Sequence, residues 1–292
     1  MELSWMMTFL TAAELGNFRK TAEVLYISQP SVTVHIKLLE KELGVRLFVR
    51  EGRKVILTEE GKRYAKHAQS VIDVYKSGLE DLQSFSQGYN AKLTIAISPL
   101  IADTILPYVL KKYMKEYPMI EIDVRVIESV HVEEAIMKEE VDIGLSCLPS
   151  KFNNLKSHPL YQDHIVLVCA HDGKDSEMAE SFDVADILST NHLFTHNHPG
   201  YWDSLCRFIS LKYPKTKMMK VSQVHITKRF IIEGLGVSFL PQSTVRRELL
   251  EGSLLEVYPT EIPLPDVNMY AVYQRDSELL KGFLQYISGY RI

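Results

Sequence analysis

The segment from Ala22 to Leu39 constrains the fold of this chain more than any other part of the sequence. It predicts two short helices joined by a tight turn, with Ser28 as the N-cap and Pro30 in the first turn of the second helix. A serine side chain can accept an otherwise unpaired backbone N–H at a helix start, and proline needs no donor there. Apolar residues spaced four and three apart predict the buried face of the second helix: Val32, Ile36 and Leu39.

The same helix is predicted to carry polar side chains on its outward face, namely Gln29, Ser31, Thr33 and His35. A helix with a polar first half and an apolar back can enter the major groove of DNA and hydrogen-bond to base edges. An ordinary helical hairpin with a capped second helix would show the same pattern. The segment alone therefore leaves both interpretations open.

Two β-prone runs follow, Leu47–Arg50 and Val55–Thr58, with Glu51–Lys54 between them. They predict a hairpin with a basic tip, which is the wing of a winged helix-turn-helix. Arg50, Arg53 and Lys54 would neutralise DNA phosphates, which adds affinity and register but no sequence information.

The first 65 residues resemble the winged helix-turn-helix domain of LysR-type transcriptional regulators, with matching spacing and no gap. The matching residues are Phe9, Ala13, Phe18, Ala22, Leu25, Ser28, Gln29, Pro30, Val32, Ile36, Leu39, Glu40, Leu43, Gly44, Leu47, Phe48, Arg50, Leu57, Thr58 and Gly61. One position departs from the family, because Val34 stands where members often carry arginine. The resemblance and the pattern together give these candidate DNA contacts: Lys20, Ser28, Gln29, Pro30, Ser31, Thr33, His35, Lys37, Arg50, Arg53 and Lys54.

The net charge of −4 is divided unevenly along the chain. Residues 1–65 hold ten Lys/Arg and eight Asp/Glu, a balance of +2, which leaves 23 against 29, or −6, for the rest. A mildly acidic body repels DNA and favours approach through the basic part.

The sequence predicts a cytoplasmic protein. No apolar run approaches the roughly 20 residues that a membrane span needs, and we expect no membrane partner. The N-terminus lacks the basic segment and apolar core of a secretory signal. The three cysteines, Cys147, Cys169 and Cys206, are odd in number and far apart, so a disulfide framework is not expected.

A long helix is predicted between the two parts of the chain, from Glu59 to about Gly88. Its apolar residues alternate spacings of four and three, as in a coiled-coil seam: Tyr64, Ala68, Val71, Tyr75, Gly78, Leu82 and Phe85. The alternative is a helix packed on its own domain. A paired helix would make the protein a dimer or a tetramer, and two recognition helices would then read a dyad-symmetric site on double-stranded DNA.

From Leu93 onward, short apolar strands alternate with helical patterns, which predicts parallel sheet covered by helices. This part resembles the family's effector domain, most clearly at Asp142–Leu145 and Glu233–Pro241. We therefore predict an α/β protein with three parts: a winged helix-turn-helix (1–58), a linker helix (59–89) and a two-lobed, periplasmic-binding-protein-like domain (90–292). Lobe I comprises 90–162 and 266–292, and lobe II comprises 163–265.

Polar residues recur where predicted strands of this domain meet helix starts or the cleft edge: Ser98, Ser129, Ser146, Thr195 and His225. Hydroxyls and backbone N–H groups that converge on helix N-termini favour an anion, most simply a small carboxylate. Each residue by itself has the alternative of a simple helix cap. Lys228 and Arg229 are expected on an exposed helix surface.

Three histidines close together in the sequence, His192, His196 and His198, with His225 behind them, suggest a metal site, since three converging imidazoles can bind zinc. No acidic residue lies within this group and no HExxH pattern is present. We therefore expect no metal and no cofactor. The chain also lacks a GxSxG elbow, a Walker loop and a GxGxxG after a strand, so no enzymatic activity is expected. A small-molecule-binding or metal-dependent protein whose N-terminal helices only dimerise it remains the alternative function.

Overall fold

The computed structural model describes residues 1–51, 54–104, 106–171, 183–259 and 261–290. The chain divides into two compact units, Met1–Gly88 and Tyr89–Ile292. The first unit contains the predicted helix-turn-helix and the second the predicted α/β domain.

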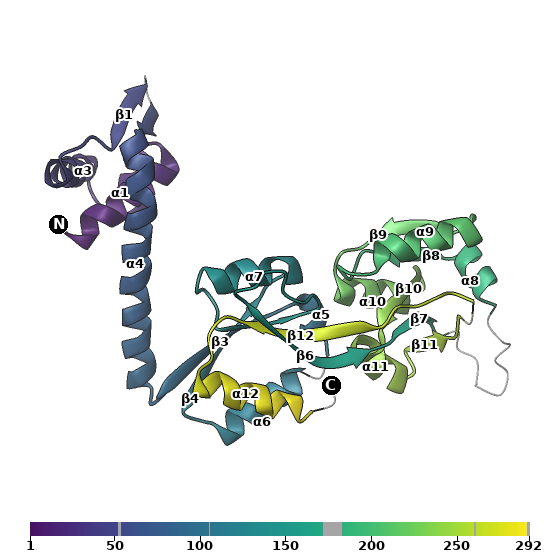
Figure 1. Cartoon of the computed structure of the whole chain (residues 1–292). Helices are drawn as coiled ribbons and strands as arrows, with labels where there is room; N and C mark the ends of the chain where they lie inside the picture. Colours follow the sequence, from purple (N-terminus) through teal and green to yellow (C-terminus); the bar gives the residue numbers. More distant parts are fainter. Residues whose placement is uncertain (52–53, 105, 172–182, 260, 291–292) are drawn as a thin grey trace. The chain divides into compact units, whose positions relative to one another are not determined.

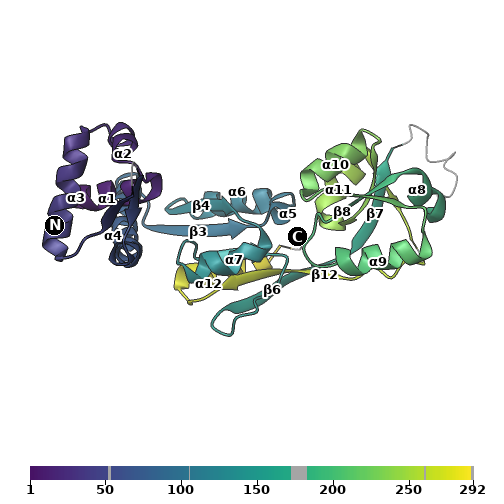
Figure 2. The ribbon, with the colours of Figure 1, turned by 90° about the horizontal axis from the view of Figure 1, so that it is seen from above.

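The first unit begins with three helices, α1 (Leu3–Leu15), α2 (Phe18–Val24) and α3 (Gln29–Leu43), seen in Figures 1 and 2. The predicted cap of α3 is confirmed, since Ser28 Oγ accepts the Ser31 N–H at 3.2 Å and Pro30 lies in the first turn. Asn17 caps α2 in the same way. These caps fix the helix starts, so the two helices meet at the turn that the sequence predicts.

The helices share one apolar core whose centre is Phe9, which is fully buried. Its ring lies 5.5 Å from the rings of Phe48 and Tyr64. The other buried members come from the three helices, the hairpin region and the long helix that follows it: Ala12, Ala22, Val32, Ile36, Leu39, Leu47, Phe48 and Ala68. The predicted inward face of α3 is thus confirmed.

The wing is an antiparallel hairpin of β1 (Phe48–Glu51) and β2 (Lys54–Leu57), with Phe48 opposite Leu57. It packs closely on the next helix, because a Cβ at Gly61 would lie 2.2 Å from the Leu47 carbonyl oxygen. Only glycine fits at that approach. The tip of the wing, including Arg53 and the side chains of Arg50 and Lys54, lies outside the described residues.

The long helix α4 (Glu59–Ser86) starts at Thr58, whose Oγ1 accepts the Gly61 N–H at 2.9 Å. Its first half joins the core through Ala68. Its second half leaves most of the predicted seam uncovered within the chain, with Leu82 66% and Phe85 71% exposed. An exposed apolar row of this kind is the surface that a second helix would cover.

The second unit contains two five-stranded sheets, one in each lobe. The lobe I sheet has the order β4–β3–β5–β12–β6 and is covered by α7 on one face and by α6 and α12 on the other (Figures 1 and 2). Its strands are β3 (Ala91–Ile97), β4 (Ile120–Val126), β5 (Ile143–Ser146), β6 (Lys156–Asp163) and β12 (Val267–Tyr273). Its helices are α5 (Pro99–Ala102), α6 (Leu106–Glu116), α7 (Ser129–Met137) and α12 (Glu278–Ser288).

The lobe II sheet has the order β11–β7–β10–β8–β9, with α10 and α11 on one face and α8 and α9 on the other. Its strands are β7 (Ile165–Ala170), β8 (His192–Thr195), β9 (Lys217–Lys220), β10 (Gly236–Pro241) and β11 (Leu254–Val257). Its helices are α8 (Val184–Thr190), α9 (Trp202–Lys212), α10 (Val224–Ile232) and α11 (Gln242–Leu250). One apolar cluster continues from the α6 and α12 side of lobe I to the α10 and α11 side of lobe II.

The two sheets are parallel only in part, which corrects the expectation of parallel sheet. β3 is parallel to β4 and β5, and β10 to β8, but β12, β6, β7 and β11 run antiparallel to their neighbours. The segment between β3 and β4 forms two helices, α5 and α6, since Asp103 ends the first. Two of the antiparallel pairs, β6 with β12 in lobe I and β11 with β7 in lobe II, lie next to the places where the chain passes from one lobe to the other.

Candidate DNA-binding surface and effector cleft

The start of α3 presents the exposed residues Ser28, Gln29 and Pro30. The side-chain amide of Gln29 has no hydrogen-bond partner among the described residues, so it is free to bond to a base. Val34 and Lys37 are also exposed further along the helix. An amide carried on a capped helix end has the donor and acceptor that reading an adenine edge requires.

Two neighbouring hydroxyls are half-buried and already bonded within the helix. Ser31 Oγ lies 2.8 Å from Ser28 Oγ, and Thr33 Oγ1 donates to the Gln29 carbonyl at 3.2 Å. A hydroxyl oxygen that donates its hydrogen in this way can still accept one, so both remain able to contact DNA.

The outward orientation expected for His35 was wrong. Its ring is half-buried against α1, and Nδ1 lies 2.9 Å from Oγ1 of the buried Thr8. Thr8 donates its only hydroxyl hydrogen to the Ser4 carbonyl at 2.8 Å, so Nδ1 of His35 must be the donor. His35 therefore holds α3 to α1.

Lys20 is exposed on α2, as a phosphate contact requires. Sequence reasoning missed Tyr26 in the turn between α2 and α3, which is 95% exposed and has a φ of 54°. A bulky residue in this left-handed conformation, with its phenol in solvent beside the start of α3, is a further candidate contact.

Three of the predicted effector residues, Ser98, Ser129 and Ser146, gather around Cys147 at the end of β5. Ser98 Oγ lies 3.5 Å from Cys147 Sγ, and Ser129 Oγ accepts the Cys147 N–H at 3.1 Å. Ser146 Oγ accepts the Leu148 N–H at 3.0 Å. Burial raises the pKa of the Cys147 thiol to about 11, so the group stays neutral. The cluster is a buried, uncharged row of hydroxyls on lobe I.

Thr195 ends β8 in lobe II, where its Oγ1 lies 2.8 Å from Nδ1 of His196. The loop that follows, residues 196–200, is held rigidly. Asn197 Oδ1 accepts from Trp202 Nε1 at 2.9 Å, and Asn197 Nδ2 donates to Ser238 Oγ at 3.0 Å. The loop meets lobe I, because a Cβ at Gly200 would lie 3.9 Å from Leu148 Cδ2.

His225 does not join the other four candidates by any hydrogen bond in the described residues, and it is exposed on α10. Lys228, expected on the surface, is instead only 7% exposed. Its Nζ lies 2.8 Å from Asp103 of lobe I, 2.7 Å from Glu248 and 2.9 Å from the Thr244 carbonyl. Arg229 is exposed, as expected. Lys228 thus joins the lobes and is not available to an effector.

A second contact between the lobes lies at the start of α10, where Gln223 Nε2 donates to Glu128 Oε1 at 2.8 Å. Glu128 directly precedes α7 in lobe I. Helix α10 is therefore bonded to lobe I at two points, Gln223 and Lys228. A ligand that changes the angle between the lobes would have to alter one or both contacts.

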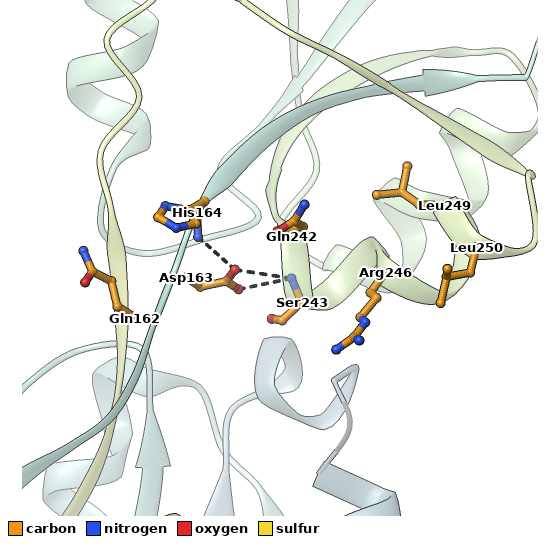
Figure 3. A pocket seen from close by; sticks show the side chains of 8 residues that line it. All are labelled: Gln162, Asp163, His164, Gln242, Ser243, Arg246, Leu249 and Leu250. Carbon is orange, nitrogen blue, oxygen red and sulfur yellow. Dashed lines mark hydrogen bonds between the residues drawn. The ribbon is translucent and has the colours of Figure 1, made fainter. Parts of the chain in front are cut away.

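A cavity of about 500 Å³ lies at the crossover between the lobes (Figure 3). Asp163 faces it, and its carboxylate accepts the backbone N–H of His164 at 2.9 Å and of Ser243 at 3.2 Å. Arg246 also lines it, from α11. The Asp163 carboxylate already accepts the backbone N–H at the start of α11, so this cavity is unfavourable for a second anion. None of the five predicted effector residues lines it.

No group of His, Cys, Asp and Glu with the geometry of a metal site occurs within the described residues. His192, His196 and His198 are not brought together there as ligands. In the same part of the chain, no helix is long and apolar enough to cross a membrane.

Two family models match the chain. Residues 3–62 match the model of the bacterial regulatory helix-turn-helix protein, lysR family, and residues 86–289 match the LysR substrate binding domain. The chain belongs to the LysR family of DNA-binding transcriptional regulators, whose members bind DNA and small-molecule effectors and form oligomers.

Among curated relatives, the chain is 46% identical over 290 residues to the HTH-type transcriptional regulator CitR of Bacillus subtilis, covering 99% of each protein. Among solved structures it is similar to CbnR bound to its target DNA (TM-score 0.71, 17% identity, 98% of this chain and 99% of that one). It is also similar to Vibrio fischeri DarR bound to DNA (TM-score 0.63, 18% identity, 99% and 98%). At these identities the solved structures show the shared fold.

Proposed function

We propose that α3 reads an operator through its exposed first turns. Gln29 and Ser31 contact bases or phosphates in the major groove, with Thr33 beside them and Ser28 and Pro30 at the start of the same helix. Lys20, Lys37 and the wing residues Arg50, Arg53 and Lys54 bind phosphates. The observation that carries this proposal is the free amide of Gln29 at the capped start of α3. His35 is left out of this set because it is bonded to α1.

The operator is bound by a dimer or a tetramer in this proposal. The exposed apolar row on the second half of α4, which includes Tyr75, Leu79, Leu82 and Phe85, supports pairing through that helix. Two copies of α3 on one face of DNA would then read two half-sites.

The proposed effector is a small carboxylate or similar anion bound between the lobes. Ser98, Ser129 and Ser146 on lobe I and Thr195 on lobe II are the residues proposed to hold it, and they are all buried. Such a ligand changes DNA binding only if it prefers one arrangement of the lobes. His225 is the least supported member, since it is exposed.

The protein would work in the cytoplasm and by binding alone, without catalysis. The relatives that match the whole chain carry the names of transcriptional regulators, which supports a role without turnover.

Footprinting on DNA upstream of the protein's own gene and its neighbours tests the proposal. The wild-type footprint should change when a carboxylate from a panel of central-metabolism acids is added. Ser98→Ala with Thr195→Val should abolish that change and leave ligand-free binding intact. Ser222→Ala, at an exposed serine between β9 and α10, is the matched control. A normal response of the double variant would show that the pocket lies elsewhere.

A further inference from the structure

His198 lies in the loop between β8 and α9 and has a ring orientation that the structure fixes. Its ring stacks on Tyr201 with centroids 4.6 Å apart, and Tyr201 is anchored by a 2.8 Å hydrogen bond from its hydroxyl to the Phe239 carbonyl. The side chain is only 5% exposed. The imidazole is therefore a rigid group of lobe II.

The hydrogen bonds decide which nitrogen of His198 carries the proton. The Gly200 backbone N–H donates to Nδ1 at 3.0 Å, and a backbone N–H can only donate. Nδ1 must then be the unprotonated nitrogen, and the neutral ring carries its hydrogen on Nε2. Burial lowers the pKa of His198 to about 4, so the neutral form is the one present at neutral pH.

The Nε2–H group has no acceptor within the described part of the chain, although it is buried. Buried donors in folded proteins are nearly always paired, and an unpaired one destabilises the fold unless something else satisfies it. His198 is thus a polar group with a missing acceptor in a molecule whose function requires a small ligand.

The loop that carries His198 lies against lobe I beside the serine cluster. A Cβ at Gly200 would lie 3.2 Å from His198 Cε1 and 3.9 Å from Leu148 Cδ2, so the loop abuts Leu148. The Leu148 N–H is itself bonded to Ser146 Oγ, and the Ser146 hydroxyl hydrogen has no acceptor among the described residues. Leu148 therefore lies between the loop that carries His198 in lobe II and Ser146 in lobe I, and each of these two residues has a buried donor hydrogen without an acceptor among the described residues.

We propose that the Nε2–H of His198 donates a hydrogen bond to a carboxylate oxygen of the effector, opposite the hydroxyl of Ser146. This inference rests on the proposed effector site and names the lobe II group that recognises its ligand. Lys228 is occupied by Asp103 and Glu248, so recognition uses neutral donors. A ligand held in this way contacts both lobes, so its affinity depends on the angle between them.

Titration calorimetry of the full-length protein with acetate, succinate and citrate tests this donor, with acetamide and succinamide as uncharged controls. His198→Gln keeps an N–H donor near the position of Nε2, whereas the shorter side chain of His198→Asn keeps an acceptor near the position of Nδ1 and does not reach that of Nε2. The carboxylate that binds the wild-type protein should bind the Gln variant within about threefold and the Asn variant at least about tenfold more weakly. Ligand-free operator binding should be unchanged in both.

Equal affinity of the Asn variant and the wild-type protein, with binding lost in Ser146→Ala, would overturn the role of His198 and leave the proposed effector site standing. Absence of binding by every carboxylate to the wild-type protein would overturn both. A measurement without variants uses ¹⁵N-histidine labelling at pH 7.5. The expected His198 spectrum has its proton on Nε2 and shifts downfield when the binding carboxylate is added, and a proton on Nδ1 would refute the inference.

Discussion

Lys228 of α10 and Asp103 at the end of α5 form a 2.8 Å ion pair that joins the two lobes of the effector domain. Glu248 approaches the same ammonium at 2.7 Å, so one buried cation lies between two carboxylates. Burial raises the pKa of Asp103, and its contact with Lys228 opposes that rise. Lys228 is thus the cation that both carboxylates share.

Lys228→Met should therefore lower the free energy of unfolding by about 3 kcal/mol, since it leaves two carboxylates partly buried without their cation. Arg229→Met is the control on the same helix, where an exposed pair with Glu233 is lost and about 0.5 kcal/mol or less is expected. Urea unfolding monitored by far-UV circular dichroism measures both. A triple variant that adds Asp103→Asn and Glu248→Gln to Lys228→Met should regain part of the lost stability, because it removes the two unpaired charges. Equal losses for Lys228→Met and Arg229→Met would argue against a stabilising role of the buried ion pairs.

Protonation of His198 should make the protein less stable as the pH falls below neutral. Its pKa is lowered from 6.5 in the unfolded chain to about 4 in the fold, so the unfolded state takes up the proton first as the pH falls. Stability is fully present above pH 6.5 and is lost between pH 6.5 and about 4. Between pH 7 and pH 5 the loss from this residue should be about 2 kcal/mol.

The difference between the wild-type protein and His198→Gln isolates this contribution, because all other titrating groups are shared. Unfolding curves at pH 7, 6 and 5 should show a smaller decrease for the variant. Parallel curves for the two proteins would mean that the imidazole has the same pKa in the fold as in the unfolded chain.

Gln29→Ala should cost about 1–3 kcal/mol of affinity for the operator and leave nonspecific binding unchanged, because the amide is free to bond to a base. Lys37→Ala is the matched change on the same helix. It should weaken binding to every sequence and reduce the magnitude of the salt slope by about 1. Fluorescence anisotropy with operator and scrambled DNA at several salt concentrations separates the two effects. If Gln29→Ala lowers the affinity for operator and scrambled DNA equally, Gln29 contacts the phosphate backbone of DNA and not a base.

The first unit was predictable because its determinants are local. The Ser28 cap, Pro30 and the spacing of Val32, Ile36 and Leu39 lie within twelve residues of one another. The error at His35 could have been avoided from the same pattern. His35 is three residues after Val32 and four before Leu39, which places it at the edge of the buried face.

The effector domain was less predictable because its decisive contacts join distant residues. Ser98, Ser129 and Ser146 were found from their places at strand ends, and the structure gathers them around Cys147. The burial of Lys228 depends on Asp103, which is far away in the sequence and in the other lobe. No spacing rule connects them, and the antiparallel pairings of β6 with β12 and of β11 with β7 likewise join residues far apart in the sequence.

The last prediction concerns the exposed row on α4. Leu82→Asp places a charge in the apolar surface that a second helix would cover, and desolvation of that charge opposes association. The dimer fraction in sedimentation velocity should fall, and operator affinity should drop at least about tenfold because one recognition helix reads too few base pairs. Gln83→Asp adds the same charge one position away from the row, at an exposed polar residue, and should leave association unchanged. If the Leu82 variant remains dimeric with normal binding, association occurs through another surface of the protein.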